Sequence, residues 1–194
     1  MQIKRAASAT RRRELIVSAA LDVLADQGAN GLTFARVCAA ANLSSSRLIT
    51  YHFTDRAGLL NAVTERVLRD MGAWVGGRLG STRPGVAQLR AFFEANASFM
   101  AANRGHVVAL VSAFMAGGGA AAGPASQQTQ SAVASLVQLA IDVGDIGPVD
   151  PAHVAFMMMR CIEGLAMAVV ADPELDPLAH ARSMADILVN GLVR

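Results

Sequence analysis

The segment LSSSRLITYHFTDR, residues 43–56, concentrates hydroxyl side chains, arginines and the only tyrosine of the chain. Hydroxyl and guanidinium groups are hydrogen-bond donors that bind phosphate oxygens and the acceptor atoms on DNA base edges. Apolar residues recur between them at helical spacing, so the polar side chains share the outward face of a short predicted helix. This combination is typical of a surface that binds a polyanion.

Charge is distributed unevenly along the 194 residues. Of the 17 basic and 15 acidic residues, eight and four lie within residues 1–56, so this segment carries +4 although the whole chain carries only +2. The remainder is slightly acidic and strongly apolar. A basic head joined to an apolar body predicts a polyanion-binding domain over residues 1–56 and a second domain with another task over residues 57–194.

Three N-terminal helices are predicted to position the polar face. Apolar residues recur every three or four positions over residues 10–27, which indicates an amphipathic helix. Thr33 stands as the N-cap of a second, alanine-rich helix over residues 34–40. One of the serines at positions 44–46 is expected to cap a third helix that ends at about residue 52. The capping serine is not decided by the pattern.

Two short helices joined by a tight turn behind a longer helix form the helix-turn-helix arrangement, whose second short helix enters the major groove of DNA. Leu43, Leu48, Ile49 and Phe53 are expected to face inward. An ordinary helical bundle whose third helix is polar on one side is the alternative. The charge asymmetry and the turn spacing both favour the DNA-binding arrangement.

The remaining residues are predicted to be helical throughout, which gives an all-α protein of about nine helices. Thr54 or Asp55 caps a fourth helix that runs to roughly residue 79, and Pro84 opens a fifth. Further helices are expected over about 106–115, 126–143, 151–171 and 177–193. The helix over 151–171 is apolar nearly all the way round, and such helices are buried on more than one side.

The chain is expected to be cytoplasmic, with no membrane partner. Residues 107–141 contain no charged side chain, but they break into two apolar pieces of about ten residues, and a bilayer needs roughly 20. No apolar run of the signal-peptide type follows the basic N-terminus. Cys38 and Cys161 are far apart in sequence and favour a reducing compartment, where two buried thiols are the ordinary interpretation.

Residues 10–60 resemble the DNA-binding domain of TetR-type transcriptional regulators. The matching features are an arginine-led first helix, the segment ANGLTFARVCAAANLS across the second helix and turn, and YHFTDRAGLL at the end of the third helix. The resemblance covers about a quarter of the chain. The rest resembles the family in architecture only, as a helical domain for ligand binding and dimerisation. The sequence differs from the family in having Asn42 at a usual glycine and one extra residue before Phe53.

The resemblance implies roles for individual residues. Thr33 caps the second helix and touches a phosphate, Tyr51 and His52 contact the DNA backbone, and Arg56 binds phosphate. The complete set of predicted DNA-binding residues is Thr33, Arg36, Ser44, Ser45, Ser46, Arg47, Thr50, Tyr51, His52 and Arg56. Arg47 either bonds both acceptors on the major-groove edge of guanine or binds a phosphate, and both interpretations stay open.

The function implied is that of a dimeric regulator, usually a repressor, that binds a pseudo-palindromic operator in double-stranded DNA and is released by a small, largely apolar effector. Trp74, Phe93, Met100, Phe114 and Met158 are the predicted ligand-binding residues, with ordinary core packing as the alternative. The dimer is expected to form through the helices over 151–171 and 177–193.

No catalytic residue, metal or cofactor is expected, because His106 and His153 lack a set of partner ligands and Asp150 is better explained as a helix cap. A transcriptional activator of the same fold is the main alternative function. A small all-helical enzyme and an architectural bundle that binds no DNA are less favoured.

Overall fold

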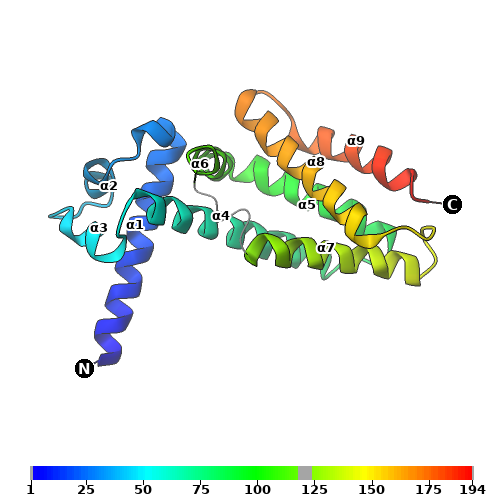
Figure 1. The fold of residues 1–194 in the computed structure, drawn as a ribbon. Coiled ribbons are helices and arrows are strands. Elements are labelled where there is room, and N and C mark those ends of the chain that lie inside the picture. Colours follow the sequence, from blue (N-terminus) through cyan, green and yellow to red (C-terminus); the bar gives the residue numbers. More distant parts are fainter. Residues whose placement is uncertain (1, 118–123, 194) are drawn as a thin grey trace. The chain divides into compact units, whose positions relative to one another are not determined.

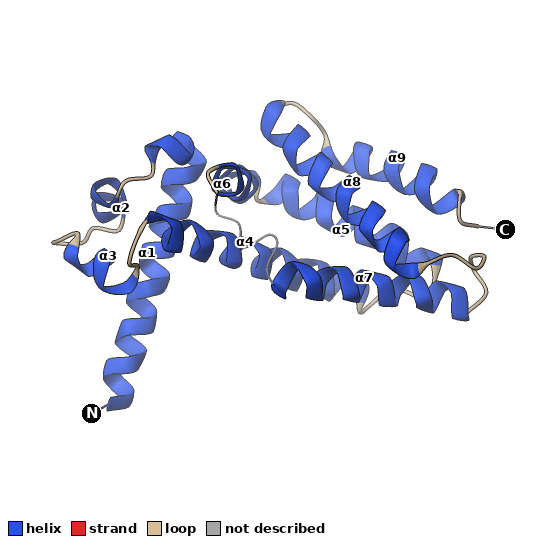
Figure 2. Ribbon diagram, in the orientation of Figure 1, coloured by secondary structure: helices blue, strands red, loops and turns tan. Residues whose placement is uncertain are grey.

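The computed structural model describes the backbone of residues 2–117 and 124–193 and the side chains of residues 7–117 and 127–193. Helices account for most of these residues (Figures 1 and 2). They are α1 Gln2–Gly31, α2 Phe34–Ala40, α3 Arg47–His52, α4 Arg56–Leu79, α5 Val86–Ala102, α6 Arg104–Met115, α7 Pro124–Asp142, α8 Pro151–Ala171 and α9 Pro177–Asn190. The predicted all-α fold of about nine helices is confirmed for the described part of the chain.

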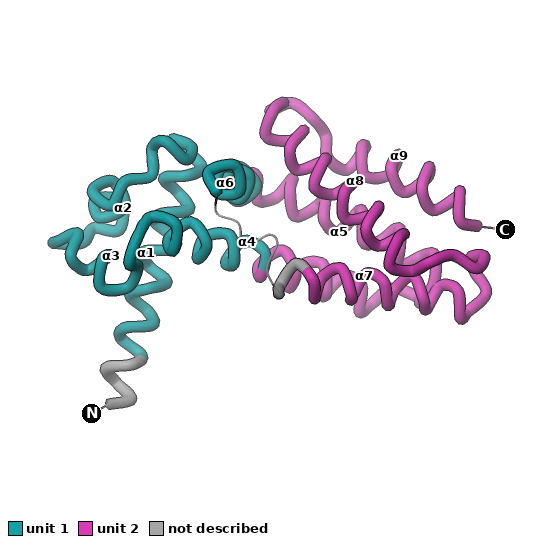
Figure 3. The backbone as a smooth tube through the Cα atoms, viewed as in Figure 1, with its two compact units in different colours: residues 1–68, 105–121 teal, residues 69–104, 122–194 magenta. Residues whose placement is uncertain are grey.

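The chain divides into two compact units (Figure 3). The first unit comprises residues 1–68 and 105–121, and the second comprises residues 69–104 and 122–194. The division falls within α4, which continues from one unit into the other. The predicted boundary between a DNA-binding domain over residues 1–56 and a ligand-binding domain over residues 57–194 differs from the boundary between these compact units. It stays a prediction.

In the first unit, α1 begins at Gln2, eight residues before the predicted start at Thr10. The sequence prediction used apolar periodicity, which begins only at Leu15, and so it missed a polar extension that contains no helix breaker. The predicted end is confirmed at Gly28, where φ is 65° and ψ is −173° and the helical geometry is interrupted. Ile16 and Leu24 are fully buried and anchor the apolar face of α1.

The turn after α2 explains why asparagine replaces the usual glycine. Asn42 has φ 50°, in the left-handed region that asparagine tolerates better than most residues. The N–H of Leu43 donates to Cys38 O at 2.9 Å, and the N–H of Asn42 donates to Ala39 O at 3.1 Å. These two bonds form a Schellman motif, which ends α2 and turns the chain toward α3.

The second unit is built from α5, α7, α8 and α9, with α5 packed against α9 and α7 against α8 (Figure 1). Phe93 of α5 and Met158 of α8 are fully buried in its core. The small residues Ala181 and Ala185 are buried on α9, so the backbones of α5 and α9 can approach closely. Arg90 on α5 donates to Asp186 at 2.5 Å and ties the pair at its edge.

Aspartates cap the last two helices, and the sequence predicts the first of them, Asp150. Asp150 accepts from the N–H of Ala152 at 2.9 Å, and Asp176 accepts from the N–H of Leu178 at 2.9 Å. A proline follows each cap in the first helical turn, where its missing N–H has no cost. The last helix ends at Asn190 rather than Val193, because Val193 forms an isolated antiparallel bridge with Ile146.

Helix α8 packs against α5, α7 and α9, and its burial on the remaining side depends on the expected dimer and stays a prediction. Phe156, Met157 and Met167 are 48%, 47% and 46% exposed, so one apolar face of α8 is open. By length and composition alone, Pro151–Ala171 is the one helix of the described residues that could cross a membrane, and 39% of its most apolar window is buried. A core helix of a folded domain passes the same test.

The part of α4 within the second unit contains Gly72, Gly76 and Gly77, all exposed. A Cβ added at any of the three would have no neighbour within 4 Å, so no close approach accounts for them. Glycine within a helix costs roughly 1 kcal/mol relative to alanine. This half of α4 is therefore an intrinsically weak helix.

Candidate nucleic-acid interface

Two buried side chains fix the orientation of α3. Ile49 is completely buried and Phe53, directly after the helix, is 4% exposed. Arg47, Thr50 and Tyr51 lie on the opposite, exposed side, and Tyr51 is 79% exposed. An aromatic ring is seldom left this open by packing alone, so the exposed side of α3 is a candidate binding surface.

Ser45 caps the start of α3. Its Oγ accepts from the N–H of Arg47 at 3.2 Å, and its carbonyl accepts from the N–H of Leu48 at 3.1 Å. Ser46 already has helical φ and ψ angles of −63° and −17° and makes no side-chain capping bond. Ser44 and Ser46 are both exposed. The sequence leaves open which of the three serines caps α3. In the structure the capping residue is Ser45.

Thr33 caps α2 as predicted, because its Oγ1 accepts from the N–H of Arg36 at 3.2 Å. The Thr50 hydroxyl donates to Arg47 O at 3.1 Å and keeps acceptor capacity toward a ligand. Within the described part of the chain, Arg47 has no side-chain partner. Its guanidinium is available to base edges or phosphates.

Arg36 and Arg56 both hold the turn between α1 and α2. Arg36 donates from Nη1 to Gly31 O at 3.1 Å. Arg56 donates from Nη2 to Ala29 O at 2.5 Å and from Nε to Leu32 O at 3.3 Å. Each guanidinium has five N–H donors, so donors remain for a phosphate. The structure therefore adds a positioning role to two residues that the sequence predicts as DNA contacts.

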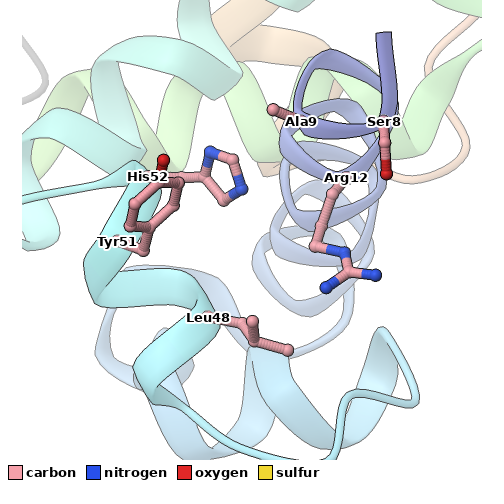
Figure 4. A pocket seen from close by; sticks show the side chains of 6 residues that line it. All are labelled: Ser8, Ala9, Arg12, Leu48, Tyr51 and His52. Carbon is pink, nitrogen blue, oxygen red and sulfur yellow. The ribbon is translucent and has the colours of Figure 1, made fainter. Parts of the chain in front are cut away.

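An open hollow of about 320 Å³ lies between α1 and α3 (Figure 4). Ser8, Ala9 and Arg12 line it from α1, and Leu48, Tyr51 and His52 line it from α3. The sequence predicts Tyr51 and His52 as DNA contacts, and its arginine run at 11–13 has two interpretations, an arm along the DNA backbone or minor groove and a solvated helix end. Ser8 and Ala9 were missed, because the helix was expected to start at residue 10.

Burial and nearby positive charge both lower the pKa of His52. Partial burial lowers the pKa of its imidazole below the ordinary value, and the nearby guanidinium groups of Arg12 and Arg13 lower this pKa further. The Tyr51 ring meets the imidazole edge to face, with 5.0 Å between ring centroids. The guanidinium of Arg13 lies 5.1 Å from the centre of the Phe53 ring, which fixes it beside the end of α3.

The predicted ligand-binding residues are distributed over both units. Phe93, Met100 and Met158 are fully buried in the second unit, whereas Phe114 belongs to the first unit and is 50% exposed. Trp74 is partly buried and donates from Nε1 to Ser98 Oγ at 2.9 Å. The Arg78 guanidinium lies 4.0 Å from the centre of its ring. These positions leave the predicted ligand site a prediction.

Sequence reasoning also missed two buried polar atoms on α4. Asn61 Oδ1 and Thr64 Oγ1 have no hydrogen-bond partner within the described structure, and Thr64 is completely buried. A buried unpaired polar group is costly and rare in folded proteins. Among the described residues, no three His, Cys, Asp or Glu side chains are grouped so that they could hold a metal ion.

The fold and this surface define a helix-turn-helix protein, in which α2 and α3 present a polar, basic face on a helical head. Residues 16–63 match the family model described as bacterial regulatory proteins, tetR family. Residues 16–63 therefore form a DNA-binding domain of the TetR type, as the sequence resemblance predicts.

The chain is similar to known proteins in part of its sequence and in its fold. The HTH-type transcriptional regulator BetI of Paraburkholderia phymatum is 34% identical over 86 residues, which are 44% of this chain and 43% of that protein. The match therefore spans less than half of the relative's length. The TetR-family transcriptional regulator PfmR of Thermus thermophilus has a TM-score of 0.73 at 18% identity, covering 92% of this chain and 99% of its own.

A second solved structure is AibR in complex with isovaleryl coenzyme A and operator DNA. Its TM-score is 0.67 at 18% identity, and the match covers 92% of this chain and 98% of AibR. At this level of identity, both solved structures establish the shared fold.

Proposed function

We propose that this protein is a cytoplasmic transcriptional regulator that binds a pseudo-palindromic DNA operator as a dimer and is released by a small, largely apolar effector. Repression is the proposed mode, with activation by the same fold as the alternative. The observation that carries the proposal is the exposed side of α3, where Arg47, Thr50 and Tyr51 project from a helix anchored by Ile49 and Phe53.

DNA binding is tested by a gel shift with DNA from directly upstream of the protein's own coding sequence, at two salt concentrations. We expect binding that weakens steeply with salt, because phosphate contacts release counterions. Arg47→Ala is the site variant, and Arg83→Ala, which removes an exposed arginine from the segment after α4, is the matched control. Equal loss in both variants would indicate nonspecific charge attraction and contradict the proposed recognition surface.

Arg47 itself has two possible roles that a mutation distinguishes. If Arg47 reads a guanine, Arg47→Ala costs about 1–3 kcal/mol on the cognate sequence and relaxes the preference at one base pair. If it binds a phosphate, the variant weakens binding to all sequences about equally. Binding measured against a set of single-base operator variants separates the two roles.

The dimer proposal is supported by the open apolar faces of α8 and α9. Phe156, Met157 and Met167 expose one side of α8, and Ile187 of α9 is 79% exposed. Two such helices from each of two chains form a four-helix contact around a two-fold axis. We expect Ile187→Glu to convert a dimer to a monomer in light scattering. Gln128→Glu adds the same charge at an exposed position of α7 and should leave the mass unchanged.

The effector proposal uses Trp74 as its own reporter. Trp74 is the only tryptophan, and its ring contacts Phe99 at 5.9 Å between centroids. Because AibR was solved with isovaleryl coenzyme A and operator DNA, that thioester is the first probe. We expect a ligand that releases DNA also to change Trp74 fluorescence. A ligand that releases DNA without this change would contradict the placement of the site near Trp74.

A further inference from the structure

The hollow between α1 and α3 has the composition of an anion site. Arg12 brings a permanent positive charge, His52 brings a titratable imidazole, and Ser8 and Tyr51 bring hydroxyl donors. None of its six lining residues is acidic. In Figure 4 the imidazole of His52 points from α3 toward α1, with Arg12 on the opposite wall. A group that enters the hollow therefore meets the Arg12 guanidinium from α1 and the His52 imidazole from α3.

The size of the hollow also suits a phosphate group. Its volume of about 320 Å³ is roughly ten times the share of liquid volume that one water molecule takes. A phosphodiester and several of its hydrating waters fit this space. Leu48 and Ala9 form the apolar part of the lining. Their side chains have no acceptor that would compete with an anion for the N–H and O–H donors of the hollow.

His52 is held in a state that an anion would change. Arg12 and Arg13 face it from α1, and the Tyr51 ring faces it from α3. The partial burial and these cations lower its pKa, so the imidazole is neutral in the free protein at neutral pH. Within the described residues, neither the His52 imidazole nor the Arg12 guanidinium has an ion-pair partner. A bound phosphate would offset the repulsion and accept an N–H from the imidazolium.

We propose that this hollow seats one backbone phosphate of bound DNA between Arg12 and His52, and that His52 takes up a proton from solvent as the phosphate enters. This inference rests on the proposed DNA-binding function and adds a proton to it. The DNA phosphate stays chemically unchanged, and the only transfer is one proton from water to an imidazole nitrogen in each head.

The direction of the pH effect follows from linkage. Below the pKa of His52 in the free protein the imidazole is already charged, and above the pKa in the complex it stays neutral in both states. Between these two values binding takes up protons, so DNA affinity falls as pH rises. One proton per head corresponds to at most roughly tenfold per pH unit, and two heads of a dimer to at most roughly a hundredfold.

The experiment measures DNA binding by fluorescence anisotropy between about pH 5 and 8, where histidines titrate. The probe is a labelled duplex from directly upstream of the coding sequence, at constant ionic strength. Wild type is compared with His52→Gln, which keeps a hydrogen-bond donor but cannot titrate. His153→Gln, at an exposed position on α8, is the matched control. We expect the wild-type and control slopes to agree, and the His52→Gln slope to be flat.

The imidazole is also followed directly by NMR, through its Cε1 proton, with and without DNA. We expect the pKa of His52 to rise on binding, and Arg12→Gln to raise this pKa in the free protein. Binding that does not vary with pH, or a slope that persists in His52→Gln, would overturn the proton-linked site alone. No DNA binding at any pH would overturn the proposed function, and this inference with it. Circular dichroism of each variant checks that the head is folded.

Discussion

Replacing Ile49 with alanine should separate the folding of the recognition helix from the contacts that it makes. Ile49 is completely buried, and the substitution removes about three carbon groups at about 0.8 kcal/mol each. A residual cavity adds a further penalty, which brings the expected loss of stability to about 3–4 kcal/mol. Helix α3 has only six residues, and helices shorter than about 12 residues are marginal in water on their own.

Most of that loss should fall on α3, because no other fully buried side chain lies within this helix. A loss of about 3 kcal/mol lowers the ratio of docked to undocked α3 by roughly a hundredfold. DNA affinity should fall by the factor by which the docked fraction falls, although Ile49 faces away from the binding surface. Thr50→Ala, which removes an exposed hydroxyl from the same helix, is the control and should leave the stability of the head nearly unchanged.

Hydrogen-deuterium exchange of the α3 amides measures the docking, anisotropy measures DNA binding, and Trp74 fluorescence during urea unfolding follows the second unit. We expect faster exchange of the α3 amides in Ile49→Ala, and DNA binding weakened by the factor by which the docked fraction falls. Unchanged exchange of the α3 amides would refute the argument that burial of Ile49 holds this helix. A reduced docked fraction without a matching loss of DNA affinity would refute the role of α3 as the recognition helix.

Three further changes test the energetics of the fold. Thr64→Val removes a buried hydroxyl that has no partner in the described structure, and should raise the free energy of unfolding by about 1 kcal/mol in a urea melt; a loss would mean that the hydroxyl is satisfied. Asp176→Ala removes the cap on the N–H of Leu178 and should cost about 1 kcal/mol, with Asp176→Asn retaining most of it. Because the folded head holds the pKa of His52 below its ordinary value of about 6.5, the stability from the neutral imidazole is present above that value and lost as pH falls through it. Thermal melts from pH 7 to 5 should therefore show a smaller decrease for His52→Gln than for wild type.

Most of the helical framework could be predicted from the sequence because its signals are local. The caps at Thr33, Asp150 and Asp176 and the left-handed turn at Asn42 are decided within a few residues. The start of α1 was missed because its first turns carry no apolar stripe. An apolar stripe marks burial, and an exposed helical extension has none.

Side-chain positions that depend on distant segments were beyond the sequence. Arg56 reaches carbonyls more than twenty residues earlier in the chain, and the hollow joins residues near position 10 to residues near position 50. Neither relation leaves a periodic signal. Composition also does not distinguish a helix buried by its own chain from one that a partner would cover, so it did not show which side of α8 is open.

The glycines at 72, 76 and 77 make α4 mechanically uneven along its length. They surround Trp74 on an exposed part of the helix, where alanine would fit without a neighbour to displace. A segment with this backbone freedom bends under a smaller load than the stiffer turns before it. Strain created beside Trp74 would therefore be absorbed mainly by the turns that contain these glycines. Alanine at these positions would stiffen α4. The glycines therefore limit how far a local displacement is transmitted along the helix.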